Sequence, residues 1–204
     1  MKLLLLLVLI AACYAEDSIY MTHGRYYESN TDCTGDDYVD FTRIDGKCYP
    51  SMQYGVFWNV SDPEVGKEFD FFSCDNNKCS LSGCTLAGKY EHNKCAAIGS
   101  GSWFFRVEKF DRTKVNVANE YYYEESTDCT NNFVLNSLVQ TECYNIYGKT
   151  SARFIIAGSD KKKLYIEESK EMRCKNPVGK TVDFDTCYPE GGMSVKFELE
   201  PKTK

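Results

Sequence analysis

The arrangement of the cysteines constrains the fold of this chain more than any other feature. The segments YYESNTDCT (26–34) and YYEESTDCT (122–130) place a cysteine in nearly the same setting, 96 residues apart. The next cysteine in each case, Cys48 or Cys143, is followed directly by a tyrosine, with an offset of 95. The register holds to within one residue, so the sequence predicts two similar units of about 95 residues each.

The N-terminus predicts the compartment. Residues 1–15, MKLLLLLVLIAACYA, combine Lys2, an apolar run and a small-residue end, which is typical of a cleavable secretory signal peptide. The run is shorter than the roughly 20 residues of a membrane-spanning helix, so we expect no membrane span in the mature chain and a secreted, extracellular protein. Removal of Cys13 leaves an even number of cysteines, which favours five disulfides in an oxidising compartment. These would join Cys33, Cys48, Cys74, Cys79, Cys84, Cys95, Cys129, Cys143, Cys174 and Cys187.

For the disulfide connectivity we predict sequential pairing within each unit. A bridge that closes a loop of around 15 residues adds on the order of 3 kcal/mol by restricting the unfolded chain, which suits a unit with a thin core. In this scheme Cys74 matches Cys174, and the remaining pair closes an insertion at 79–84. On this interpretation the repeated TDCT segment has a structural role and does not form an active site. The predicted bridges are Cys33–Cys48, Cys74–Cys95, Cys79–Cys84, Cys129–Cys143 and Cys174–Cys187.

The segments between the cysteines have the composition of strands. Alternating or aromatic-rich runs such as SVKFELE and WFFRVEKF favour a pleated, half-buried surface, and ARFIIAG and LYIEES flank a polar SDKKK turn. The fold class we predict is all-β, with two tandem similar antiparallel β domains stabilised by disulfides. The expected organisation is a signal peptide at 1–15, a first β domain at 16–109 and a second at 110–204.

Charge and motifs exclude several functions. The formal net charge is −6 and no basic stripe interleaves with aromatic residues, so we expect no nucleic-acid partner. Only His23 and His92 are available beside the cysteines, which does not fit a tetrahedral zinc site. No nucleophile elbow or phosphate-binding glycine loop is present. The sequence therefore predicts no catalytic residue, no metal and no cofactor.

Two segments are candidates for binding. Tyr121, Tyr122 and Tyr123 cannot all face one core, and tyrosine suits protein and sugar surfaces. Ser80 and Ser82 lie in the predicted closed insertion, a candidate for preorganised recognition. The competing interpretations are tyrosines that cap a sandwich and an insertion that is merely protected from proteolysis.

From these segments we predict a non-enzymatic protein that binds an extracellular protein or glycan. The alternatives are a secreted hydrolase with a carboxylate site and a proteinase inhibitor. Asn59, in Asn59-Val60-Ser61, is a predicted glycosylation site beside a hairpin tip.

The signal peptide, the tandem cysteine spacing and the composition rich in Tyr, Asn and Lys resemble those of small secreted cysteine-rich proteins of social amoebae. The resemblance spans the mature chain and implies secretion, without implying an activity. The two-unit layout also invites comparison with βγ-crystallin-like proteins, whose aromatic-glycine corner and paired calcium motif are not recognisable in this chain.

Overall fold

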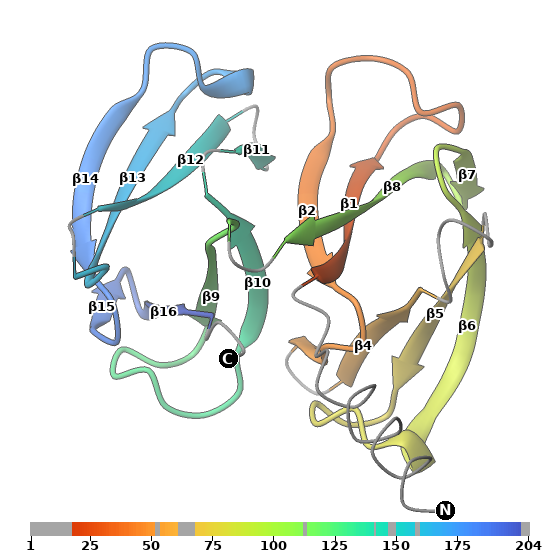
Figure 1. Cartoon of the computed structure of the whole chain (residues 1–204), viewed down its shortest axis with the longest axis horizontal. Coiled ribbons are helices and arrows are strands. Elements are labelled where there is room, and N and C mark those ends of the chain that lie inside the picture. Colours follow the sequence, from red (N-terminus) through yellow and green to blue (C-terminus); the bar gives the residue numbers. More distant parts are fainter. Residues whose placement is uncertain are drawn as a thin grey trace, which may run out of the picture.

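The computed structural model shows an all-β protein, as predicted (Figure 1). It describes residues 18–51, 54–60, 68–111, 114–140, 142–146, 150–157 and 160–200, so the predicted signal peptide at 1–15 lies outside the described residues. Apart from the strands, the described residues hold two single-turn 3₁₀ segments, η1 (Leu81–Gly83) and η2 (Met172–Cys174).

The first eight strands form one lobe, which we call the first lobe. Strands β2, β1, β8 and β7 pair in that order, and strands β3, β4, β5 and β6 pair in a second group. The antiparallel pairing of β4, which ends at Asn59, with β5 agrees with the hairpin predicted beside that residue. The strands are β1 (Ser18–Tyr27), β2 (Val39–Ile44), β3 (Tyr49–Ser51), β4 (Tyr54–Asn59), β5 (Glu68–Cys74), β6 (Cys84–Glu91), β7 (Cys95–Ile98) and β8 (Gly101–Asp111).

The last eight strands form the second lobe, and their pairing follows the same order as that of the first. Strands β10, β9, β16 and β15 form one group and β11, β12, β13 and β14 the other. The β12–β13 pair is the hairpin predicted around SDKKK. The strands are β9 (Val117–Tyr123), β10 (Val134–Val139), β11 (Cys143–Ile146), β12 (Thr150–Ala157), β13 (Lys163–Ser169), β14 (Val178–Asp183), β15 (Cys187–Glu190) and β16 (Met193–Leu199).

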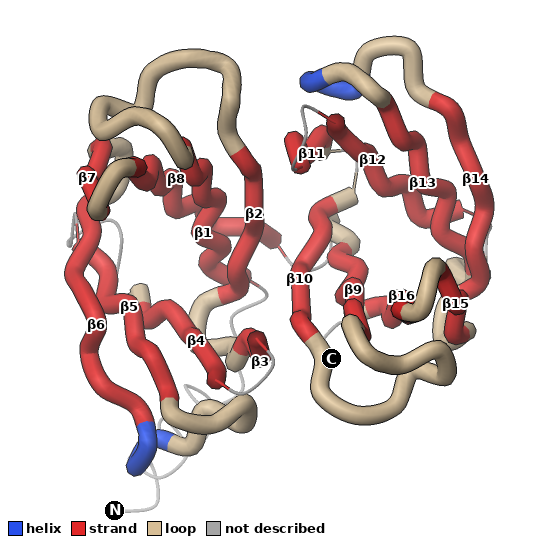
Figure 2. The backbone as a smooth tube through the Cα atoms, turned by 180° about the vertical axis from the view of Figure 1, so that it is seen from behind, coloured by secondary structure: helices blue, strands red, loops and turns tan. Residues whose placement is uncertain are grey.

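The two lobes meet along β2 and β10, which lie next to each other in both backbone views (Figures 1 and 2). β10 pairs antiparallel with β2 at Ser137 and Thr42 and with β3 at Val134 and Ser51. The change of lobe falls between the end of β8 and the start of β9. The division into domains 16–109 and 110–204 stays a prediction, because β10 pairs with strands of both lobes.

All ten cysteines of the described residues are in disulfides, and each bridge joins two cysteines of one lobe. The sequential pairing was wrong. The observed bridges are Cys33–Cys95, Cys48–Cys79, Cys74–Cys84, Cys129–Cys187 and Cys143–Cys174.

The mistake came from matching the wrong cysteines between the lobes. Cys48–Cys79 and Cys143–Cys174 have the same sequence separation of 31, so Cys174 corresponds to Cys79 and not to Cys74. Both Cys79 and Cys174 also have positive φ, 48° and 50°. The insertion closed at 79–84 therefore does not exist. The additional bridge is Cys74–Cys84, which ties β5 to β6 at register partners.

The repeated TDCT segments form the same turn in both lobes. Cys33 and Cys129 have φ of 55° and 57°. Their backbone N–H groups donate to the buried hydroxyls of Ser102 and Ser194, at 3.1 Å in each case. Each Asp in the motif accepts a hydrogen bond from the Thr hydroxyl two residues later (Thr34 to Asp32, 2.7 Å; Thr130 to Asp128, 2.6 Å). These contacts give the motif a structural role.

The tyrosines that follow Cys48 and Cys143 form hydrogen bonds both within their own lobe and to the other lobe. The hydroxyl of Tyr49 accepts a hydrogen bond from the Ile44 backbone N–H at 2.6 Å and lies 2.8 Å from the Ser137 hydroxyl in the other lobe. Correspondingly, the hydroxyl of Tyr144 accepts from the Val139 N–H at 2.8 Å and lies 3.2 Å from that of Thr42. The same contact is thus made twice with the lobes exchanged, as at an approximate two-fold axis.

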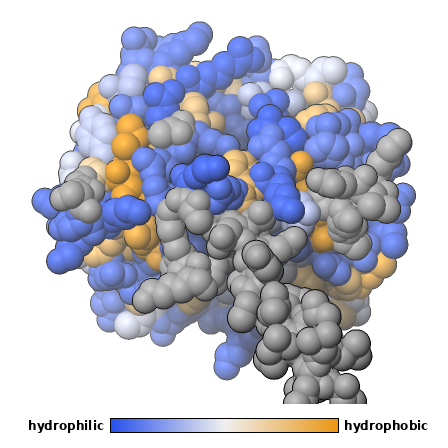
Figure 3. Space-filling model, in the orientation of Figure 1, coloured by the Kyte–Doolittle hydropathy of each residue, from blue (hydrophilic) through white to orange (hydrophobic). Residues whose placement is uncertain are grey.

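Three buried clusters make up the core. One is aromatic and lies mainly in the first lobe, one is mostly aliphatic and lies in the second, and a small third cluster joins Met21 and Ile44 to Val117 and Val139 across the junction. On the face that Figure 3 shows, polar side chains predominate among the coloured residues, with apolar areas between them.

Candidate functional site

A cavity of about 780 Å³ lies at the junction of the lobes. Its walls come from β2, β3, β4, β5 and β8 of the first lobe and from β9 to β16 of the second, and they are largely apolar. Exposed residues such as Ile146 and Lys180 belong to the lining, so the cavity reaches the surface on the side of the second lobe. The largest apolar side chains of the lining are Phe41, Trp58, Phe71, Trp103, Phe154 and Phe197.

Arg43 brings a positive charge into this apolar space. Side chains alternate along β2, so Arg43 faces the same way as Phe41, into the aromatic core. Its guanidinium lies 4.6 Å from the ring centroid of Tyr49, 5.2 Å from that of Phe41 and 5.9 Å from that of Trp58. Aromatic faces attract a cation at such distances. Burial lowers the pKa of Arg43, yet a guanidinium stays charged in proteins.

The hydrogen bonds of Arg43 do not satisfy all the N–H groups of its guanidinium. Nη1 donates to the Thr42 carbonyl at 3.0 Å and to Oδ1 of Asn136 at 3.5 Å. Nε is buried and has no acceptor, and no carboxylate of the described residues forms an ion pair with Arg43. The buried indole N–H of Trp58, in the same cavity, has no acceptor either. Buried polar groups are normally hydrogen-bonded, so two such donors in one cavity are informative.

Glu120 and Asn136 supply the polar groups on the second-lobe side. They are register partners on β9 and β10, and Nδ2 of Asn136 donates to Oε2 of Glu120 at 3.0 Å. Burial raises the pKa of Glu120; the hydrogen bond from Asn136 and the charge of Lys180 oppose this rise, while Glu168 adds to it. Asn136 therefore lies between Arg43 and Glu120, with its amide hydrogen-bonded to both.

A second, more polar pocket of about 510 Å³ lies beside the junction. In it, Nδ1 of His23 is 3.1 Å from the Thr42 hydroxyl and 3.3 Å from Oε2 of Glu142. Asp40 accepts from both nitrogens of Asn145 at 2.9 Å, and burial raises the pKa of Asp40. The contacts of His23 with Glu142 and of Asp40 with Asn145 cross from one lobe to the other, so we interpret this pocket as part of the interface between the lobes.

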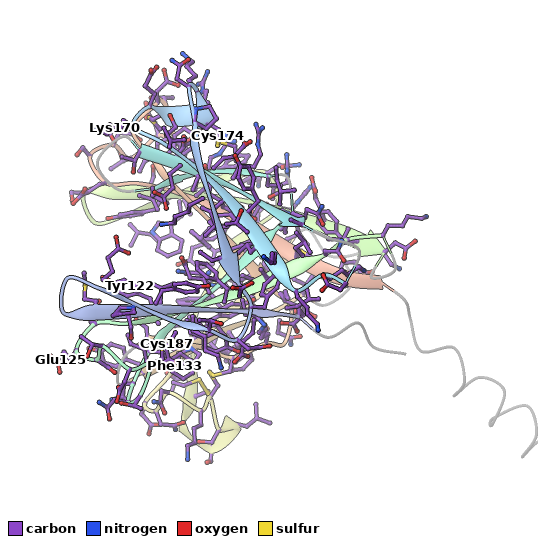
Figure 4. All side chains as sticks on the ribbon, turned by 90° about the vertical axis from the view of Figure 1, so that its left-hand side faces the viewer. Tyr122, Glu125, Phe133, Lys170, Cys174 and Cys187 are labelled. Atoms are coloured by element: carbon purple, nitrogen blue, oxygen red, sulfur yellow. A yellow bond between two sulfur atoms is a disulfide. The ribbon has the colours of Figure 1, made fainter. Side chains whose placement is uncertain are left out.

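The tyrosines predicted to bind a partner pack within the protein instead. Tyr121 and Tyr123 have ring centroids 5.1 and 5.6 Å from that of Phe133, and Tyr123 is buried. The hydroxyl of Tyr122 contacts the sulfur of Met193. Figure 4 shows Tyr122 and Phe133 on one layer of the second lobe and Cys174 on the other. The role of all three in binding stays a prediction that the packing does not favour.

The serine segment lies apart from the cavity. Ser80 and Ser82 are exposed beside and within η1, next to Leu81, which is 81% exposed, and none of the three lines the cavity. The structure does not bring this segment together with the tyrosines. Asn59 is exposed at the end of β4, as expected, while Ser61 of the same acceptor sequence lies outside the described residues.

The residues that sequence reasoning missed are Arg43, Asn136 and Glu120. Each is a polar residue with another polar residue beside it in a strand-like segment, and such residues usually face solvent. A signal was nevertheless present in the comparison of the two units. Arg43 lies at the position of Leu138, because the residues that follow them, Ile44 and Val139, donate to corresponding tyrosines.

Comparison with models of protein families, with curated proteins and with solved structures finds no match for this chain. The resemblance to secreted proteins of social amoebae therefore stays an expectation from the sequence. None of the helical segments among the described residues has the length and apolar character needed to span a bilayer. The function proposed below therefore rests on the cavity.

Proposed function

We propose that this is a secreted, non-enzymatic binding protein whose ligand is a small molecule with an apolar body. The observation that carries the proposal is the largely apolar cavity of about 780 Å³ between the lobes. Ligand pockets typically measure roughly 300–1,000 Å³ and combine apolar walls with a few polar groups. Five disulfides support secretion, because such bonds persist in oxidising compartments.

The sequence predicted an extracellular protein or glycan as the partner, recognised by an aromatic surface. The tyrosines of that surface are packed, and the two tryptophans of the chain, Trp58 and Trp103, line the cavity instead. This arrangement favours a small ligand inside the protein over a large partner on its surface. The proteinase inhibitor stays an untested alternative: the exposed residues 80–82 lie in a loop that Cys74–Cys84 closes and that Cys48–Cys79 ties to β3, and none of them lines the cavity.

A titration with the neutral apolar fluorophore N-phenyl-1-naphthylamine tests the proposal. We expect its emission to rise on binding and the fluorescence of Trp58 and Trp103 to be quenched, because both line the cavity. Ala152→Phe should block the cavity, since Ala152 is buried in its wall, whereas Ala97→Phe on the exposed face of β7 should not. Circular dichroism must show both variants folded. Equal binding by both folded variants would refute the proposed site.

A second candidate is a hydrolase with a carboxylate site. Glu120 and Glu168 both line the cavity, and the raised pKa of Glu120 suits a general acid. An assay of the mature protein with p-nitrophenyl esters and glycosides decides between the two functions. Hydrolysis that Glu120→Gln abolishes would favour the enzyme; fluorophore binding without any hydrolysis would favour the binding protein.

A further inference from the structure

We propose that the ligand carries an anionic head group, a carboxylate, which binds Arg43, and an apolar body, which lies against the second lobe. This inference rests on the proposed function of the cavity and adds the chemical class of the ligand. Three features of the structure support it: the missing counter-ion of Arg43, the character of the unsatisfied polar atoms, and the division of the cavity by Asn136.

Arg43 is partly buried, its Nε completely so, and no carboxylate of the described residues forms an ion pair with it. A cation shielded from bulk water is stabilised by a counter-charge and by acceptors for its N–H groups. The rings of Phe41, Tyr49 and Trp58 cover its faces, which leaves the N–H edge of the guanidinium for hydrogen bonds. A ligand carboxylate matches that edge in charge and in geometry.

The unsatisfied atoms of the cavity lining are donors. Among the described residues that line the cavity, the buried side-chain atoms without a partner are Nε of Arg43 and the indole Nε1 of Trp58. Both lie in the first-lobe part of the cavity, on β2 and β4. Two unmatched donors call for acceptor atoms on the ligand. An amine would supply further donors and leave both unmatched.

The aromatic side chains around Arg43 also argue against a cationic ligand. A cluster of aromatic faces can bind a ligand ammonium group, but in this protein the guanidinium of Arg43 already occupies the cluster. Glu120 could attract a ligand amine from the other side. It is hydrogen-bonded to Asn136, whose amide separates it from Arg43.

The apolar body of the ligand fits the second-lobe part of the cavity. Its wall is formed by Leu138, Phe154, Ile166 and Phe197, all at most 6% exposed. An acyl chain that extends from a carboxylate at Arg43 past Asn136 would lie along these side chains. Such burial of apolar surface contributes most of the affinity, and the head group supplies the selectivity.

Three twelve-carbon ligands test the proposal at pH 7.4: dodecanoate and dodecylamine below their critical micelle concentrations, and dodecanol below its solubility limit. Affinity is measured by displacement of N-phenyl-1-naphthylamine and by tryptophan quenching. We expect dodecanoate to bind at least about tenfold more tightly than dodecanol, because hydrogen bonds to a charged group are strong. Equal affinity for the two, or a preference for dodecylamine, would overturn the proposal.

Substitutions locate the head group. Arg43→Met keeps the length of the side chain without its charge and should remove the preference for dodecanoate while changing dodecanol affinity by less than about twofold. The matched control is Arg106→Met, an arginine on β8 that is half-exposed, pairs with Glu108 and does not line the cavity. If Arg43→Met fails to fold, the comparison of the three ligands on the unaltered protein still decides the question.

The outcomes also separate this inference from the proposed function. If the fluorophore and all three ligands fail to bind, the cavity is not a binding site and both proposals are wrong. If the fluorophore and dodecanol bind as tightly as dodecanoate, the cavity binds apolar molecules but Arg43 does not select an anion. A preference for dodecanoate that persists in folded Arg43→Met would place the carboxylate elsewhere and overturn the assignment to Arg43.

Discussion

In the first lobe the ring of Phe41 lies directly over Gly24, its register partner on β1, where an added Cβ would come within 2.0 Å of the ring. In the second lobe the corresponding register partners are Asn136 and Glu120, which share a hydrogen bond. The same backbone arrangement thus carries an apolar pair in one lobe and a polar pair in the other. Phe41, Asn136 and Glu120 line the cavity.

At the position of Arg43 the difference between the lobes is reversed. Arg43 corresponds to Leu138, so here the first lobe has the charge and the second the apolar side chain. By contrast, the lobes agree in the long disulfides, in the Cys-Tyr hydrogen bonds and in the serine contacts of the TDCT turns. The shared contacts maintain the fold. Of the differences between the lobes, the exchange of Phe41 for Asn136 and that of Arg43 for Leu138 lie at the cavity, whereas the additional bridge Cys74–Cys84 lies away from it. We connect the differences at the cavity with the proposed binding of a ligand.

The largest effect should come from the long bridges that both lobes share. Replacing Cys33 and Cys95 with Ser removes a bridge of sequence separation 62, and the matching change at Cys129 and Cys187 removes one of 58. The chain-entropy relation gives a loss of about 4 kcal/mol in the free energy of unfolding for each. Urea denaturation measures it. A loss from only one of the two double variants would contradict the equivalence of the lobes.

The additional bridge of the first lobe should matter less. Cys74–Cys84 has a sequence separation of 10, for which the same relation gives about 3 kcal/mol. We expect the double Ser variant to be secreted and folded, with fluorophore binding unchanged, because neither cysteine lines the cavity. A variant that unfolds altogether would show that the first lobe requires this bridge and that the lobes differ in more than the cavity.

The interface tyrosines should give smaller and matched losses. Tyr49→Phe and Tyr144→Phe each leave a buried backbone N–H without its acceptor, which costs about 1–3 kcal/mol. The control is Tyr54→Phe, whose side chain is 58% exposed and which should change stability by less than about 0.5 kcal/mol. The approximate two-fold arrangement predicts similar losses for both interface variants, and a loss confined to one would argue against it.

The smallest effect concerns Glu120 and has a defined pH dependence. Because burial raises its pKa, Glu120 favours the folded state fully at low pH, and this contribution is lost as pH rises through the raised pKa. Glu120→Gln cannot ionise, so its stability relative to the unaltered protein should increase from pH 4 to pH 8, by on the order of 1 kcal/mol or less. Glu125→Gln, in an exposed turn, is the control. A difference that stays constant with pH would mean that Glu120 is well solvated.

The sequence predicts those features that depend on residues close together along the chain, and it fails for those that depend on distant segments. The alternation in SVKFELE and the turn between ARFIIAG and LYIEES depend on neighbours along the chain, and the strands form there. The pairing of Cys48 with Cys79 depends on how β3, β4 and β5 fold back on one another, which spacing alone does not reveal.

The cavity could not be predicted at all, because it exists only where two lobes pack. Arg43 and Asn136 are 93 residues apart and meet through the pairing of β2 with β10. The residues next to Arg43 and Asn136 in the sequence do not indicate that the two side chains meet. Comparing the two units position by position, at the offset of 95 that relates Cys48 to Cys143, would have placed Arg43 opposite Leu138.

The central claim, that a ligand enters the cavity between the lobes, is tested most directly by its two tryptophans. Trp58→Phe and Trp103→Phe each leave one tryptophan in the lining, and no other tryptophan is present in the chain. Titration with dodecanoate should shift or quench the emission of the remaining tryptophan in both variants, with the same dissociation constant that calorimetry gives. Binding heat without a change in either tryptophan would show that the ligand lies outside the cavity.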